Sequence, residues 1–284
     1  MKILSFGEII WDVYPDQSCI GGAPLNFAAH TVKSGANAYL LSAVGDDALG
    51  RDAMEKLAHF GVRSEFVSTV KGKPTGQCLV TLDASGVPTY EILREVAYDR
   101  ISLSDGLLRE SFDAICFGTL ALREAQNREV LKRLLDLGIC KNVYCDLNLR
   151  APFYSTETVE LCLSSAHILK LSETELEYVS AQILHTSFAS YEESLCALTA
   201  RYSNLKLILL TCGEDGAYAY VCKTEQLYFE PAKAVEVVST VGAGDSFGAA
   251  FLVSYLNRED IQTSLQKATE QSAYVVAHAE AIPD

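Results

Sequence analysis

Short apolar runs alternate with stretches of helical periodicity along most of the chain. A short apolar run predicts a buried strand, and a helix between two such runs allows them to lie parallel in one sheet. The alternation therefore predicts an α/β fold in which helices cover both faces of a mostly parallel sheet. The predicted strands are residues 2–6, 37–45, 113–118, 141–147, 167–171 and 205–213, and the predicted helices are residues 24–35, 47–60, 243–256 and 261–278.

One region interrupts this alternation. Between residues 65 and 95, two β-type runs flank the sequence DASG at residues 83–86, which is typical of a hairpin turn. A hairpin does not fit readily into a parallel sheet, so we predict a small β-rich lid beside the core, to which residues 13–19 add a strand. The alternative is a surface hairpin without a role in any site. The predicted division assigns residues 1–12, 25–64 and 97–284 to the core, and residues 13–24 and 65–96 to the lid.

Composition narrows the class of protein. The chain has 284 residues, 49% of them hydrophobic and 21% charged, which is typical of a globular protein. Its net charge of −14 argues against nucleic acid or an anionic membrane as a partner, because both favour basic surfaces. The nine cysteines are scattered and include no CxxC pair, which favours reduced, buried thiols. Glu8 and Asp12 interrupt the apolar N-terminal stretch and argue against a signal peptide, so we expect a soluble, cytoplasmic protein.

The sequence VVSTVGAGDSFGAAFL at residues 237–252 contains the strongest chemical pattern. We predict a strand at residues 235–239, a turn through Gly242, Ala243 and Gly244, and a helix with Asp245 in its first turn. Free N–H groups and the helix dipole make such a terminus a seat for a phosphoryl group, and a carboxylate there can accept a proton from a hydroxyl. The alternative is a tight turn in which Asp245 only caps the helix. Neither a GxGxxG after the first strand nor a GK[ST] after these glycines is present.

GAGDSF at residues 242–247 resembles the C-terminal signature of the ribokinase-like (PfkB) carbohydrate kinases, and GGAPLNFAAH at residues 21–30 resembles their N-terminal signature. Landmarks between the two also match, so the likeness covers nearly the whole chain. The resemblance implies a doubly wound α/β core with a β lid, ATP and Mg²⁺ as cofactors, and sugar phosphorylation. It also implies that Asp245 is the catalytic base and that the backbone of Gly242, Ala243 and Gly244 forms an anion hole.

The same resemblance implies positions for the two substrates. Asp12, Gly21, Gly22 and Asn26 match positions that hold sugar hydroxyls, and paired hydrogen bonds from such side chains suit a diol. The residues implied on the nucleotide side are Thr211, Gly213 and Gly216 beside ATP, Lys170 and Ser172 near the phosphates, and Glu175 contacting Mg²⁺ through water. For Glu173 and Glu175 the alternative is a solvated, acidic helix start.

Two positions depart from the family pattern. Ser172 stands where much of the family has Asn, although fructokinases and ketodeoxygluconate kinases often have Lys-x-Ser there. Ser239 stands where many members have an Asp that helps to bind a monovalent cation, so dependence on K⁺ stays an open question.

CDLNLRAPFY at residues 145–154 resembles the DxNxR segment of bacterial fructokinases and ketodeoxygluconate kinases, in which Arg150 would hold a phosphate or a carboxylate. The opening segment and the lid sequence resemble fructokinases more closely, with Tyr90 and Ile92 as apolar contacts for the sugar. We therefore expect D-fructose, phosphorylated at its 6-hydroxyl. The alternatives are ketodeoxygluconate, another sugar, or a non-catalytic sugar-binding regulator. A homodimer formed through the lid is an open option.

Overall fold

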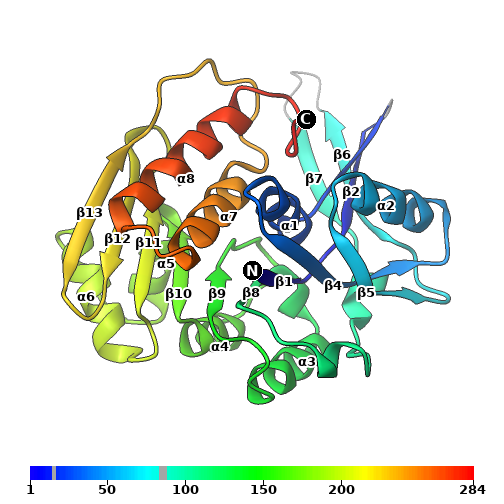
Figure 1. Cartoon of the computed structure of the whole chain (residues 1–284), viewed down its shortest axis with the longest axis horizontal. Helices are drawn as coiled ribbons and strands as arrows, with labels where there is room; N and C mark the ends of the chain where they lie inside the picture. Colours follow the sequence, from blue (N-terminus) through cyan, green and yellow to red (C-terminus); the bar gives the residue numbers. More distant parts are fainter. Residues whose placement is uncertain (15–16, 83–87) are drawn as a thin grey trace.

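A large twisted sheet with helices on both faces forms the centre of the computed structural model, which describes residues 1–14, 17–82 and 88–284 (Figure 1). Within these residues the sheet has nine strands in the order β13-β12-β11-β10-β9-β8-β1-β4-β5, all parallel to their neighbours from β11 to β5. The strands β12 and β13 add an antiparallel edge. The bounds of the nine strands are β1 Lys2–Phe6, β4 Asn37–Gly45, β5 Arg63–Val70, β8 Ala114–Phe117, β9 Val143–Asp146, β10 Ile168–Ser172, β11 Leu207–Thr211, β12 Gly216–Val221 and β13 Gln226–Pro231. The predicted mostly parallel sheet is confirmed.

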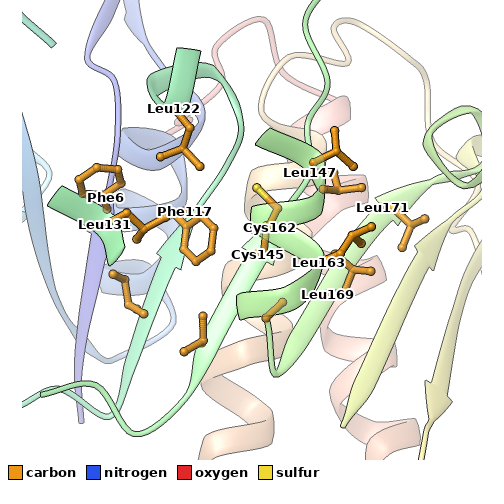
Figure 2. Packing of buried hydrophobic residues seen from close by; sticks show 14 of the residues in the cluster. Phe6, Phe117, Leu122, Leu131, Cys145, Leu147, Cys162, Leu163, Leu169 and Leu171 are labelled. Atoms are coloured by element: carbon orange, nitrogen blue, oxygen red, sulfur yellow. The ribbon is translucent and has the colours of Figure 1, made fainter. Parts of the chain in front are cut away.

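Alternation of side chains along each strand divides the core between the two faces. Leu169 and Leu171 of β10 point to the same face as Cys145 of β9. Figure 2 shows these residues packed with Cys162 and Leu163 of a covering helix. Lys170 and Asp146, one position out of step, point to the opposite face. On the first face lie α3 Ala125–Asp136, α4 Thr156–Ser165, α5 Glu173–Gln182 and α6 Tyr191–Arg201; on the second lie α1 Ala23–Lys33, α2 Ala48–His59, α7 Ala243–Leu256 and α8 Ile261–Val276.

A second, smaller sheet forms the lid at the upper right of Figure 1. In the described part of the chain its order is β3-β2-β6-β7, with bounds β2 Ile10–Val13, β3 Ser18–Gly21, β6 Gly76–Leu82 and β7 Pro88–Ile92. The turn predicted at residues 83–86 lies outside the described residues. Three predicted boundaries were wrong: residues 10–12 belong to the lid strand β2, residues 23–24 begin helix α1 of the core, and residues 65–70 belong to β5. The apolar residues of β5 complete the edge of the large sheet against β4, which explains its position there.

The predicted strand at residues 235–239 was also wrong. This segment is irregular and lies beside the end of α8, where the N–H groups of Val238 and Ser239 both donate to the carbonyl oxygen of Val276. Valine is common in strands because it packs on a half-buried sheet surface, but among the described residues this segment pairs with no strand. Val235, Val237 and Val238 are exposed instead, with exposed fractions of 41%, 66% and 57%. In the described residues, none of the helices has the length and apolar composition needed to cross a membrane.

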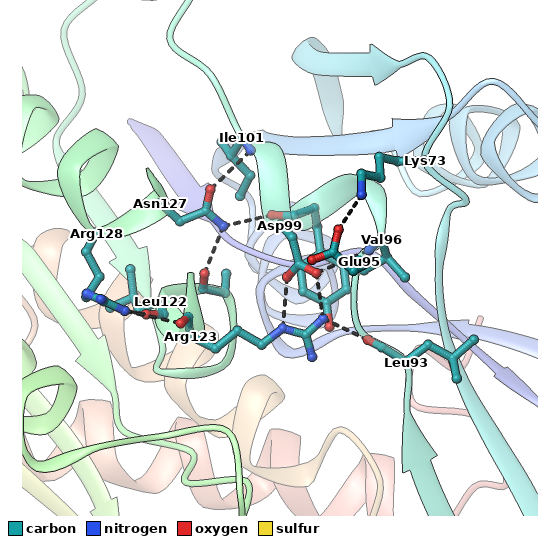
Figure 3. Close-up of polar contacts among 12 residues, drawn as sticks. Lys73, Leu93, Glu95, Val96, Asp99, Ile101, Leu122, Arg123, Asn127 and Arg128 are labelled. Atoms are coloured by element: carbon teal, nitrogen blue, oxygen red, sulfur yellow. Dashed lines mark hydrogen bonds and ion pairs between the residues drawn. The ribbon is translucent and has the colours of Figure 1, made fainter. Parts of the chain in front are cut away.

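A buried ion pair fixes the place where the chain returns from the lid to the core (Figure 3). The guanidinium group of Arg123 donates from Nε to Oδ1 of Asp99 at 2.8 Å and from Nη2 to Oδ2 at 2.9 Å. Nη2 also donates to the carbonyl oxygen of Leu93, one residue after β7, at 2.7 Å. The two side chains are 2% and 3% exposed, and the rings of Tyr98 and Phe153 lie 4.9 and 5.1 Å from the guanidinium carbon. Arg123 therefore joins the lid, the core and Phe153.

Because Asp99 would stay buried without its partner, Arg123→Met is expected to lower the free energy of unfolding by about 3–5 kcal/mol. Urea denaturation at pH 7 measures the loss. The matched control is Lys141→Met, whose pair with Asp113 is 71% exposed on the lysine side, so it should cost less than about 1 kcal/mol. Equal costs for the two variants would contradict the role given to Arg123.

Candidate active site

Two cavities meet at the N-terminus of α7. The first, the lid pocket, has a volume of about 630 Å³ and lies between the underside of the lid and the carboxyl ends of the central strands. The second, the edge groove, has a volume of about 750 Å³ and runs along β11, β12 and α8. Thr240 and Gly244 line both cavities. A molecule in one cavity can therefore contact a molecule in the other across this turn.

The turn before α7 has a backbone that requires glycine. Gly242 is the N-cap residue with φ of 80°, and a β-carbon there would lie 2.8 Å from the carbonyl oxygen of Ala281. The N–H of Ala243 donates to the carbonyl oxygen of Thr240. The N–H groups of Gly244 and Asp245 have no acceptor among the described residues. Unpaired N–H groups at the start of a helix of 14 residues are able to donate hydrogen bonds to an anion.

Asp245 projects from this first turn into the lid pocket. Nδ2 of Asn26 in α1 donates to its Oδ2 at 2.9 Å, which leaves Oδ1 free to accept a proton. Burial raises the pKa of Asp245 above its ordinary value, while the hydrogen bond from Asn26 and the charges of Lys170 and Arg150 act to lower it. These three neighbours therefore favour the ionised form of Asp245, whereas burial disfavours it.

Lys170 and Asp146 form a second buried ion pair beneath the turn. Their positions are in register on adjacent strands β10 and β9, and Nζ lies 3.0 and 2.8 Å from the two carboxylate oxygens. The side chains are 8% and 9% exposed, and a β-carbon on Gly244 would lie 3.0 Å from the same Nζ. Although burial works to lower the pKa of Lys170, the carboxylates of Asp146, Glu175 and Asp245 raise it. A positive charge is therefore held beside the anion-binding terminus.

Glu175 links the segment after β9 to the start of α5. Its Oε1 accepts from the N–H of Leu149 at 2.7 Å, and its Oε2 accepts from the N–H of Ser172 at 2.8 Å. Ser172 caps α5 and accepts in turn from the N–H of Glu175, which makes a capping box. Each oxygen already has one backbone donor, so contact with a metal would use the remaining lone pairs. The predicted water-mediated contact with Mg²⁺ stays a prediction.

On the lid side, Asp12 stands in a row of paired residues across the small sheet. Cys19 and Cys78 are its partners on β3 and β6, and Ile92 of β7 pairs with Cys78. Asp12 and Cys78 are paired in register on neighbouring strands, and burial raises the pKa of the Cys78 thiol to about 11. Cys78 therefore keeps its proton at neutral pH and can donate to Asp12. Burial also raises the pKa of Asp12.

Most of the predicted site residues do come together. Those lining the lid pocket are Asp12, Gly22, Asn26, Tyr90, Arg150, Lys170, Gly242, Gly244 and Asp245, and those lining the edge groove are Thr211, Gly213, Gly216, Ala243 and Gly244. Gly21, Ser172 and Glu175 are outside both linings. Glu8, Cys78 and Asp146 line the lid pocket although we had not proposed them as site residues. A carboxylate at the end of a predicted buried strand was the available signal for Glu8 and Asp146, whereas nothing in the sequence distinguished Cys78 from the other cysteines.

The chain is similar to known proteins over almost its whole length. The profile of the family described as "pfkB family carbohydrate kinase" matches residues 5–284. A protein named fructokinase from Solanum tuberosum is 28% identical over 278 residues, covering 91% of this chain and 82% of that protein. An ATP-dependent 6-phosphofructokinase from Thermoanaerobacterium thermosaccharolyticum is 28% identical over 304 residues, with 99% and 90% covered. The crystal structure of a fructokinase with bound ATP from Xylella fastidiosa superposes with a TM-score of 0.86 at 21% identity, covering 99% of this chain and 94% of that chain.

Asn26→Ala is expected to raise the pKa of Asp245 further, because the variant lacks the donor that stabilises the carboxylate. The carboxyl carbon chemical shift of Asp245, followed by NMR in a carbon-labelled protein as the pH is changed, measures this effect. Asn142→Ala, which removes an amide that donates to the carbonyl oxygen of Asp113, is the control and should leave that titration in place. An unchanged titration of Asp245 in Asn26→Ala would count against this contact.

Proposed function

The chain belongs to the pfkB family of carbohydrate kinases, and from this premise we propose that it transfers the γ-phosphoryl group of ATP to the 6-hydroxyl of D-fructose. The observation that supports this most strongly is the meeting of the lid pocket and the edge groove at the turn before α7, beside Asp245. A kinase needs adjoining sites for donor and acceptor, an anion seat between them and a base on the acceptor side. The adjoining cavities, the unpaired N–H groups of Gly244 and Asp245, and the carboxyl group of Asp245 support these three requirements in turn.

The lid pocket suits a small polyhydroxylated acceptor. Asp12 lines this pocket and has lone pairs for sugar hydroxyls, and Oδ1 of Asn26 is buried without a partner among the described residues. Arg150 lines the same pocket and offers planar, charged donors. Tyr90 and Ile92 add apolar surface from the lid. A sugar bound here would satisfy the buried oxygen of Asn26, which gives that amide a function besides its contact with Asp245.

The edge groove suits a nucleotide. Its walls include Ala217, Val235, Val237 and Val276, which supply the apolar surface that a purine base needs. A base in this groove would cover Val235 and Val237, which accounts for the exposure of these two side chains. From this wall the groove leads to Ala243 and Gly244 at the start of α7. We therefore propose that the base lies against the valines and that the phosphates extend to the helix terminus.

Lys170 and Glu175 fit the phosphates and their metal ion. The ammonium group beside Gly244 would contact the transferred phosphoryl group, and Glu175 would hold a water molecule of Mg²⁺ with its remaining lone pairs. Bound Mg²⁺ supplies neutralisation of the phosphate charge. Lys170 cannot approach further without leaving Asp146, so we propose that it acts as a fixed charge.

In the proposed step, the 6-hydroxyl oxygen attacks the γ-phosphorus while Oδ1 of Asp245 accepts the hydroxyl proton. The bond between the γ-phosphorus and its bridging oxygen breaks, and ADP leaves with that electron pair. The N–H groups of Gly244 and Asp245 stabilise the charge on the moving phosphoryl group. Asn26 holds the other oxygen of Asp245 and so directs Oδ1 to the acceptor.

Fructose is favoured by the names of the relatives and by the lid sequence, but Arg150 also suits an acidic acceptor such as ketodeoxygluconate. Coupled ADP release with Mg-ATP should show the highest kcat/KM for fructose among fructose, ketodeoxygluconate, fructose 6-phosphate, ribose and glucose. Assays with and without K⁺ test whether activity depends on this cation when Ser239 replaces the Asp of other family members. A preference for another sugar would keep the mechanism and reject fructose. Absence of turnover with all of them, by folded protein, would favour the sugar-binding regulator.

Asp245→Asn is expected to lower kcat by a factor of about 100 or more, because the amide cannot accept the hydroxyl proton. The same change at Asp260, the exposed N-cap of α8, keeps the capping oxygen and should leave kcat near that of the wild type. Fructose affinity, measured by calorimetry without ATP, should change much less than kcat. Near-normal turnover by folded Asp245→Asn would reject Asp245 as the base.

A further inference from the structure

We propose that Glu8 is a substrate-contacting residue of the lid pocket, whose carboxyl group binds a sugar hydroxyl and selects neutral sugars over acceptors that carry a carboxylate or a phosphate. This inference rests on the proposed sugar kinase function and adds a class of acceptor to it. Glu8 follows β1 and Gly7, at the carboxyl edge of the large sheet. It lines the lid pocket together with Asn26 and Asp245.

The burial of Glu8 lacks the usual structural explanation. Glu8 is only 3% exposed. A glutamate is seldom buried unless a cation or a full set of hydrogen-bond donors compensates the loss of hydration of its carboxylate. Among the described residues, the ion pairs buried on both sides are Arg123–Asp99 and Lys170–Asp146, and Glu8 is in neither. Backbone N–H groups of Glu8 itself and of Ala23 lie near its carboxyl group. The side that faces the cavity is left for a ligand.

Charged and titratable groups face Glu8 from several elements. Asp245 of α7 has the like charge, Arg150 after β9 has the opposite charge, and Tyr98 before α3 and Cys116 of β8 are also within its electrostatic reach. Burial is the main cause that raises the pKa of Glu8 to about 7, and the charge of Asp245 adds to it. Near neutral pH the group is therefore partly protonated, in contrast to an ordinary glutamate.

The charges of the other residues that line the pocket also favour a neutral acceptor. Lys170 is already paired with Asp146, so Arg150 is the remaining cation of the lining against Glu8, Asp12 and Asp245. A carboxylate or phosphate on the acceptor would bring further negative charge to a site with this excess. A neutral sugar avoids that repulsion. A protonated Glu8 can also donate to one sugar oxygen and accept from another, which its neighbours Asp12 and Asp245 cannot do when ionised.

The alternative is that Glu8 supports the turn at Gly22, where a β-carbon would lie 3.4 Å from Cγ of Glu8. Glu8→Gln distinguishes the two because it keeps the shape of the side chain and removes its titration. The measurements are KM and kcat for fructose, fructose 6-phosphate and ketodeoxygluconate between about pH 6 and pH 9, a range that spans the titration of Glu8. Glu55→Gln, at an exposed position of α2, is the matched control.

The wild-type KM for fructose is expected to rise about tenfold as the pH increases through 7, because ionised Glu8 loses its donor. In Glu8→Gln this rise should disappear, while KM for the two anionic acceptors should fall about tenfold because one repulsive charge is gone. Glu55→Gln should keep the wild-type profile and selectivity. These results together would support the proposal.

Identical pH profiles and acceptor selectivity in Glu8→Gln and the wild type would overturn it and assign Glu8 to the turn. A folded Glu8→Gln protein that is inactive with every acceptor would also overturn the selective role. If Glu8→Gln does not fold, as judged by circular dichroism, the wild-type KM for fructose still tests the proposal. A KM that does not change through pH 7 would overturn it. If the wild type has no kinase activity, the proposed function fails, and titration of fructose into wild type and Glu8→Gln tests the contact separately.

Discussion

The ion pair between Lys170 and Asp146 holds together the part of the molecule in which both cavities end. It lies on the face of the sheet that α7 covers, directly below Gly244, and it joins two adjacent strands at their carboxyl ends. Its lysine also helps to lower the pKa of Asp245 against the effect of burial. Without this cation, Glu8, Asp146 and Asp245 would share a buried space with mutual repulsion, which a folded chain avoids by protonation or rearrangement.

Parallel topology explains why distant segments supply one site. All parallel strands end at the same edge of the sheet. Glu8 after β1, Arg150 after β9 and Lys170 of β10 therefore meet there although they are far apart in the chain. Helix α7 places its N-terminus over this edge and contributes Asp245, and α1 contributes Asn26. The lid closes the space from the opposite side with Asp12 and Cys78.

The lid is fixed to the core at both ends of its β6–β7 hairpin. Before β6, the side chain of Asp47, which caps α2, accepts hydrogen bonds from the N–H and the hydroxyl of Thr75 at 2.8 and 2.6 Å. After β7, Arg123 binds the carbonyl oxygen of Leu93 and packs against Phe153, a residue of the lid pocket. Movement of the lid would therefore be transmitted to a wall of the pocket, because the same guanidinium group contacts both.

Hydrophobic periodicity alone was enough to predict most of the strands and the helices at residues 47–60 and 243–256, since burial on a sheet face or a helix face imposes its period directly on the sequence. The pattern of Gly242, Gly244 and Asp245 likewise predicted a glycine turn followed by a helix with Asp245 in its first turn. Residues 65–70 and 235–239 were misassigned, because β-branched residues suit a sheet edge and a ligand groove as well as a lid or a strand. Contacts across more than a hundred residues, such as Asn26 with Asp245, and the cavity-facing position of Glu8 follow from the packing of lid, sheet and α7. The local sequence does not predict these contacts, because they depend on which elements the folded chain brings to one edge of the sheet.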